Sequence, residues 1–96
     1  MNNKVKISVA MPSPEFKVLS ISGNAGDLLE KHKVNDKALL LVRNGKILYS
    51  EKDRDQELNA GESWSIPANI LHKVTCIDES EIFVVLSTST KMRFEK

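Results

Sequence analysis

The chain alternates apolar and polar residues over several short segments, and this period of two is typical of half-buried strands. The alternation is clear in 5–9 and again in 16–21. A near-continuous apolar run at 38–42 is of the kind that is buried on both faces, and 81–90 is strongly β-prone. About eight to ten short strands, with turn signals roughly every 8–12 residues, predict an antiparallel sandwich or barrel.

Three further segments bear on the arrangement of the strands. Residues 27–33 could form a helical turn or a strand, and their shortness favours a strand. Asn44-Gly45 is the dipeptide of a two-residue hairpin turn, in which both positions take positive φ. We therefore expect 46–50 to return antiparallel to 37–43. The tail, 91–96, could be a last edge strand, a strand that covers a partner, or a frayed end.

Composition narrows the classes of function. The chain has 96 residues, a formal charge of +1 and one cysteine, so we expect a single domain over 1–96. Because the charges are scattered without a like-sign block, we do not expect a nucleic acid partner. Cys76 cannot form an internal disulfide, which fits a reducing compartment. No apolar run approaches the ~18 residues of a membrane-spanning helix, so the expected location is the cytoplasm.

The stretch Gly-Glu-Ser-Trp-Ser-Ile-Pro-Ala-Asn-Ile-Leu-His, which ends at His72, carries the most specific pattern. Gly61, Pro67 and His72 stand at the spacings of the second motif of the cupins, small β-barrel proteins, which reads G-x5-P-x-G-x2-H-x3-N. Asn69 replaces the inner glycine of that motif, a mild change because asparagine tolerates positive φ. Cys76 replaces its final asparagine. The chain therefore resembles a small cupin.

The first cupin motif, G-x5-H-x-H-x3,4-E-x6-G, supplies two histidines and a glutamate. Together with the later histidine they hold a divalent metal in that family. In this chain Gly26 and Gly45 match the glycines, and His32 matches the first histidine. Val34 replaces the second histidine and Ala38 replaces the glutamate. The resemblance thus implies a cupin with a degenerate metal-binding motif.

The resemblance covers about 26–86 and implies an all-β fold, a single antiparallel β-barrel or jelly-roll. Of its metal ligands only His32 and His72 remain, whereas zinc and non-heme iron sites usually have at least three protein ligands. Cys76 lies too far along the strand from His72, at ~13 Å. Glu30 is the better third candidate, because in a regular strand it shares the face of His32 at ~6.6 Å. Iron, manganese, nickel or zinc is therefore the alternative to a metal-free interior.

Two classes of function follow. The first is a barrel that binds a small molecule without catalysis, in a pocket lined by His32, Val34, Ala38, Leu40, Tyr49, His72 and Val74. The second is a metal-dependent enzyme of the dioxygenase or isomerase kind, using His32, His72 and a carboxylate. A third possibility is an assembly element with a vestigial pocket. Small cupins generally dimerise, and β-prone ends with unpaired edges favour association, so we expect a homodimer.

Overall fold

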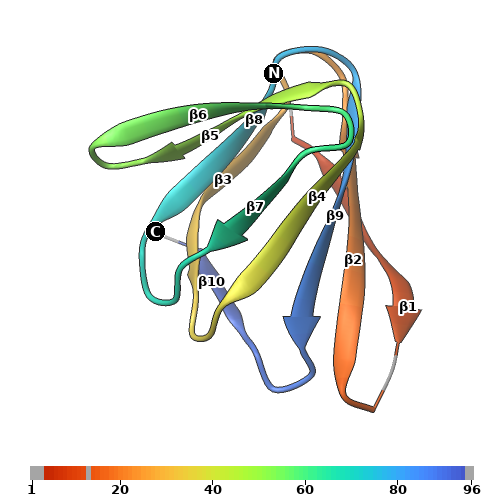
Figure 1. Ribbon diagram of the computed structural model, residues 1–96, viewed down its shortest axis with the longest axis vertical. Helices are drawn as coiled ribbons and strands as arrows, with labels where there is room; N and C mark the ends of the chain where they lie inside the picture. Colours follow the sequence, from red (N-terminus) through yellow and green to blue (C-terminus); the bar gives the residue numbers. More distant parts are fainter. Residues whose placement is uncertain (1–3, 13, 95–96) are drawn as a thin grey trace.

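Ten β-strands, arranged in two antiparallel sheets of five, make up the structure (Figure 1). This computed structural model describes residues 4–12 and 14–94. The expectation of an all-β antiparallel fold is confirmed, with two curved sheets that pack face to face rather than one strictly closed barrel. Within the described ranges there is no helix long and apolar enough to span a membrane.

The first sheet has the strand order β1-β2-β9-β4-β7. Its strands are β1 (Lys6–Pro12), β2 (Phe16–Gly23), β9 (Ser80–Ser87), β4 (Ala38–Asn44) and β7 (Ser63–Ile66). Strand β9, the ninth of the ten strands in sequence, lies at the centre of the sheet between β2 and β4. The fold therefore depends on pairings between residues far apart in the chain.

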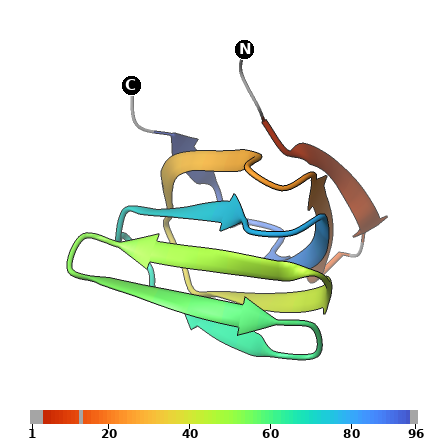
Figure 2. The ribbon, with the colours of Figure 1, turned by 90° about the horizontal axis from the view of Figure 1, so that it is seen from above.

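The second sheet has the strand order β10-β3-β8-β5-β6. Its strands are β10 (Met92–Phe94), β3 (Leu28–Val34), β8 (His72–Cys76), β5 (Lys46–Glu51) and β6 (Arg54–Asn59). The segment with two possible structures, 27–33, is thus largely strand, as favoured above. The tail forms an edge strand, β10, which lies on the same side of the molecule as β1 (Figure 2).

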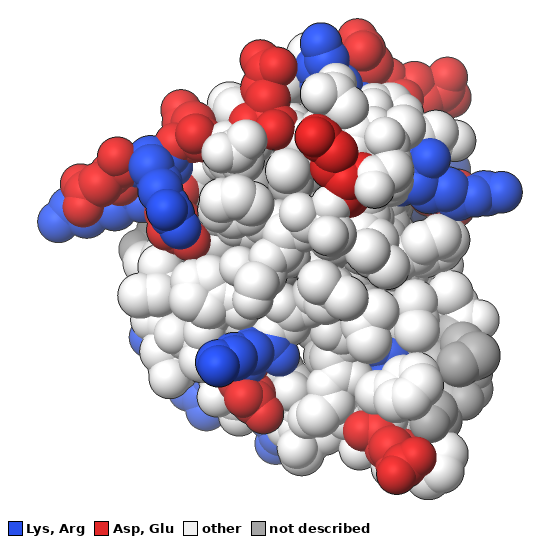
Figure 3. All heavy atoms as spheres, in the orientation of Figure 1, with Lys and Arg blue, Asp and Glu red and all other residues white. Residues whose placement is uncertain are grey.

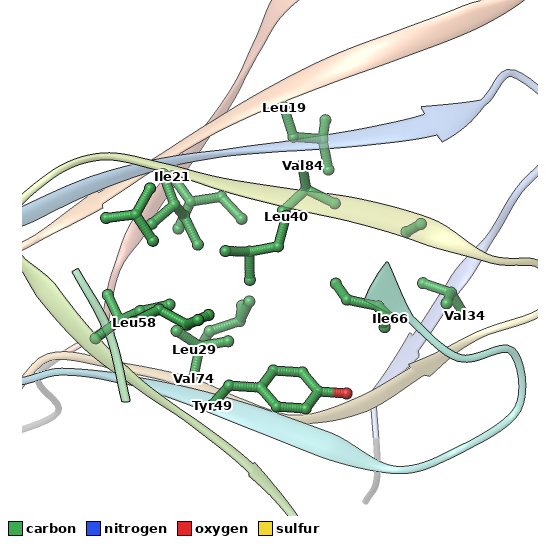
Figure 4. Packing of buried hydrophobic residues seen from close by; sticks show 14 of the residues in the cluster. Leu19, Ile21, Leu29, Val34, Leu40, Tyr49, Leu58, Ile66, Val74 and Val84 are labelled. Carbon is green, nitrogen blue, oxygen red and sulfur yellow. The ribbon is translucent and has the colours of Figure 1, made fainter. Parts of the chain in front are cut away.

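The period-two pattern places one apolar row of each strand between the sheets. Strand β9 shows this most regularly, because every second residue from Ser80 to Leu86 is buried. Figure 4 shows Leu40 and Val84 of the first sheet directed toward Val74 and Tyr49 of the second. A single hydrophobic cluster therefore joins the two sheets.

The hairpin expected at Asn44-Gly45 is wrong, because β4 and β5 belong to different sheets. Gly45 has φ 86°, whereas the φ of Asn44 is not positive. Here the chain crosses from one sheet to the other and packs tightly on Ser80. The Lys46 N–H donates to Ser80 Oγ at 3.0 Å, and that hydroxyl lies 3.0 Å from the Lys46 carbonyl. A glycine is required by both the backbone angle and this close approach.

We expect Gly45→Ala to destabilise the fold more than Gly61→Ala. Both glycines have positive φ, which costs a residue with a side chain roughly 1–2 kcal/mol. A Cβ at position 45 would also collide with Ser80 and the Glu79 carbonyl, whereas one at position 61 would meet nothing. Overpacking of this kind adds roughly 1–3 kcal/mol. Urea denaturation of both variants checks the difference, and equal losses would contradict the crossover packing.

Candidate functional site

The two histidines of the chain meet inside the fold. His32 lies on β3 and His72 on β8, and the two are paired across these neighbouring strands. Each is only 2% exposed, and their ring centroids are 4.2 Å apart with an angle of 62° between the planes. The structure thus brings together, in edge contact, two side chains that the motif spacing had singled out.

Both imidazoles are oriented by the same kind of hydrogen bond. His32 Nδ1 lies 2.8 Å from the Glu30 carbonyl, and His72 Nδ1 lies 3.0 Å from the Ile70 carbonyl. A carbonyl can only accept, so each neutral ring carries its proton on Nδ1 and keeps the lone pair of Nε2 as an acceptor. Because the two ring nitrogens point in nearly opposite directions, each Nε2 is directed away from the carbonyl of its own chain segment.

Two backbone irregularities supply these carbonyls. In β3 the register with β8 shifts between Leu29 and His32, which marks a β-bulge. Before β8, Asn69 has φ 63°, and its N–H donates to the Val34 carbonyl at 2.7 Å. That bond ties the loop carrying Ile70 to the end of β3. The tolerance of Asn69 for positive φ, expected from the motif, is therefore confirmed.

Burial keeps both rings neutral. It lowers the pKa of His32 to about 4, and the neighbouring His72 lowers this pKa further, against the opposing effect of the hydrogen bond to Glu30. Burial also lowers the pKa of His72, although the Ile70 carbonyl and the charge of Glu51 act in the opposite direction. At neutral pH the pair therefore presents two hydrogen-bond acceptors and no positive charge.

The pair faces a small apolar cavity of about 10 Å³, close to the space one water requires. Of the pocket residues expected from the sequence, His32, Val34, Leu40, His72 and Val74 line it, whereas Ala38 and Tyr49 do not. Seven lining residues were not anticipated, and these are Ile21, Leu29, Ile66, Ile82, Val84, Leu86 and Met92. Most are the inward rows of the strands, so the alternating pattern could have located them.

Tyr49 supports the pair from outside the cavity. It is fully buried, and its ring stacks on His72 with centroids 5.3 Å apart. Its hydroxyl donates to Glu51 Oε2 at 2.7 Å, and Arg54 Nε donates to Glu51 Oε1 at 3.3 Å. Burial and then Glu51 raise the pKa of Tyr49, so it stays a neutral donor. Arg54 also lies over the ring of Trp64, 5.3 Å from its centroid.

Glu30 does not share the face of His32, and the expectation that it does is wrong. The bulge at Glu30 and Lys31 adds one residue, so Leu29 and His32 both point inward while Glu30 points out. The Glu30 carboxylate is exposed and lies 3.1 Å from Lys4 Nζ. Glu30 therefore acts on His32 only through its backbone carbonyl.

The donors of this site differ from those of the divalent centre of the cupins. The positions of its second histidine and its glutamate hold Val34 and Ala38, both buried aliphatic side chains. Across residues 4–12 and 14–94 no group of three His, Cys, Asp or Glu residues is placed to hold a metal ion. Two imidazoles in an apolar cavity offer neither the ligand number nor the negative charge that such an ion needs. The donor set does not fit that centre.

Strand β10 contributes two side chains that sequence reasoning missed. Met92 pairs with Val34 and lines the cavity. Phe94 pairs with His32, and their ring centroids are 5.1 Å apart. The tail alone gives no signal for these contacts, because they depend on which edge the last strand joins.

No family model matches the sequence, and neither does any curated protein. The fold, in contrast, is similar to many solved structures. A cupin superfamily protein from Desulfitobacterium hafniense is 15% identical with a TM-score of 0.80, over 91% of this chain and 80% of that one. KdgF from a Halomonas species is 13% identical with a TM-score of 0.77, over 86% and 79%.

A third similar structure, the DMSP lyase DddQ from Ruegeria pomeroyi, is 12% identical with a TM-score of 0.83, over 95% of this chain and 51% of that one. At such identities the likeness shows the fold. The chain is thus a small domain of the cupin fold. Its motif glycines behave accordingly, because Gly26, Gly45 and Gly61 all have positive φ.

The stability of the protein should fall in mild acid because of His32. Its folded-state pKa of about 4 lies below the ordinary 6.5, so the unfolded chain binds the extra proton first. The contribution is complete above pH 6.5 and is lost as the pH falls toward 4, by roughly 3 kcal/mol at most. Denaturant titrations of the wild type and His32→Gln between pH 4 and 7.5 check this. An equal slope in both would contradict it.

Proposed function

We propose that this protein is a binding barrel that holds a small molecule through the histidine pair, without catalysis and without a divalent metal cofactor. The observation that carries the proposal is that both rings, with the proton held on Nδ1 and Nε2 left as an acceptor, line an otherwise apolar cavity. A ligand group that donates a hydrogen bond to these imidazoles is therefore bound favourably.

The same geometry argues against the enzyme alternative. A general base needs a pKa near the working pH, whereas the pKa of His32 is about 4. The hydroxyl of Tyr49 already donates to Glu51, and the Glu30 carboxylate faces Lys4 outside the barrel. One similar structure is named a lyase, but the ligand positions of this chain hold Val34 and Ala38.

Titration followed by imidazole ¹⁵N spectra tests the binding proposal. We expect small neutral donors such as methanol, phenol and acetamide to shift the His72 and His32 Nε2 resonances. His72→Phe should weaken the effect on His32, because it removes one of the two acceptors while keeping an aromatic ring beside Tyr49. Exposed Ser65→Ala is the matched control and should bind as the wild type does.

Titration with divalent iron, manganese, nickel and zinc tests the alternative. We expect no binding that depends on the histidine pair, because two neutral ligands leave the ion's charge uncompensated. A submicromolar dissociation constant, lost in His32→Gln, would instead establish a metal centre and overturn the metal-free assignment.

We also propose that two copies associate through the outer face of the first sheet. The register aligns Val18, Val85 and Leu39 in one row and Phe83 with Leu41 in the next. All five point away from the core, and Leu39 and Leu41 are 41% and 37% exposed. We call these residues the outer apolar patch. In Figure 3 the charged side chains lie around the edge of one face and its centre is uncharged.

An uncharged patch can meet its own copy across a two-fold axis without like-charge repulsion, which is why a second copy is the proposed occupant. Leu41→Asp should shift the mass in light scattering from the dimer toward the 10.8 kDa chain, because it places a carboxylate in the buried interface. Ile70→Asp, at a similarly exposed loop residue outside the patch, should remain dimeric. A wild type that is monomeric at micromolar concentration would overturn the proposal.

A further inference from the structure

We propose that a groove between β1 and β10 holds the body of the ligand, and that the ligand is an apolar molecule with one neutral donor group. This inference rests on the proposed binding function of the histidine pair and names the chemistry of its ligand. The groove has a volume of about 350 Å³, within the range of small-molecule sites. Its apolar lining comes from Val5, Ile7, Leu28, Leu29 and Phe94.

The groove and the inner cavity share a wall. Leu29 lines both spaces. Phe94 lines the groove and also contacts the ring of His32, with the two ring centroids 5.1 Å apart. Two residues earlier on the same strand, Met92 lines the inner cavity. A ligand seated in the groove is therefore separated from the acceptors by one layer of side chains.

That layer includes a short strand at the edge of its sheet. Strand β10 has three residues and lies at the edge of its sheet, paired with β3 alone. Phe94 is 48% exposed, so displacing its ring exposes little additional apolar surface. Figure 2 shows β10 and β1 on the same side of the molecule, and Phe94 of β10 and Ile7 of β1 both line the groove. Since the resting cavity is only about 10 Å³, the donor group of a ligand enters by shifting this layer.

The chemistry of the two spaces defines the ligand class. The inner end presents Nε2 acceptors, so a carboxylate or phosphate, which can only accept, finds no partner there. The apolar lining of the groove suits an alkyl chain or an aromatic ring. Among the described residues that line the groove, the charged ones are Lys4 and Glu30, which are paired with each other at 3.1 Å and together give no net attraction for an ion. An alcohol or a phenol with an apolar body meets all these conditions.

Octanol, octanoate and methyl octyl ether are the matched probes, because they share a chain and differ in the head group. We expect octanol to perturb backbone amides of β1, β3 and β10 together with the Nε2 resonances of the histidine pair. Octanoate and the ether lack a donor and should bind at least about tenfold more weakly, the cost of leaving the acceptors unpaired.

Two exposed residues of β1 provide the matched variants. Ile7 lines the groove and Val9 does not, although both are exposed, at 44% and 57%. Ile7→Ser should weaken octanol binding about tenfold by removing an aliphatic contact, whereas Val9→Ser should leave it unchanged. Circular dichroism confirms that both variants are folded.

Each result has a defined meaning. If octanol shifts the histidine resonances but Ile7→Ser binds normally, the groove assignment is overturned and the binding function stands. Octanoate binding as tightly as octanol overturns the neutral-donor class. If no probe binds while methanol or phenol still reaches the pair, the groove is again overturned. Loss of every histidine-dependent response, small donors included, removes the binding function itself.

Discussion

Two imidazoles are buried in contact with each other, and each needs a hydrogen-bond acceptor for its Nδ1–H. In this structure that acceptor is not a side chain. The backbone meets this requirement, through the carbonyls of Glu30 and Ile70. Each carbonyl is available because the chain departs from regular strand geometry just before its histidine, by the β-bulge in β3 and by positive φ at Asn69. The fixed tautomer of both rings follows from this arrangement, whereas burial is what keeps the rings neutral.

Much of the fold could be predicted, because local alternation and motif spacing both reflect it. Gly61 and Asn69, the motif positions, do have positive φ. Asn44-Gly45 shows the limit of such reasoning. Its local preference fits a hairpin, but Gly45 instead connects two sheets, since β9 takes the place beside β4 that the hairpin would have given to β5. That competition is decided by pairings between distant residues, which a dipeptide does not encode.

The candidate site was predictable to the same extent. The spacing of the motifs found His32 and His72, but strand parity misplaced Glu30 because one extra residue in a bulge reverses every later side chain. Tyr49 points inward as parity requires, yet its hydroxyl is committed to Glu51 and its ring stacks on His72 instead of lining the cavity. The role of Met92 had no local signal at all.

The substitutions at the family's ligand positions explain why the interior is small. Val34 and Ala38 need no partner, so the surrounding aliphatic side chains close around them and leave about 10 Å³. The two remaining histidines still carry acceptors, and leaving them unpaired costs ~1–3 kcal/mol each. Such a site favours a hydrogen-bond donor that carries no charge. A single water is small enough for the closed cavity. A ligand must replace the hydrogen bonds of that water in order to compete with it. In the proposed binding function, selectivity for a neutral donor rests on the aliphatic side chains of Val34 and Ala38 together with the hydrogen bonds that fix the histidines.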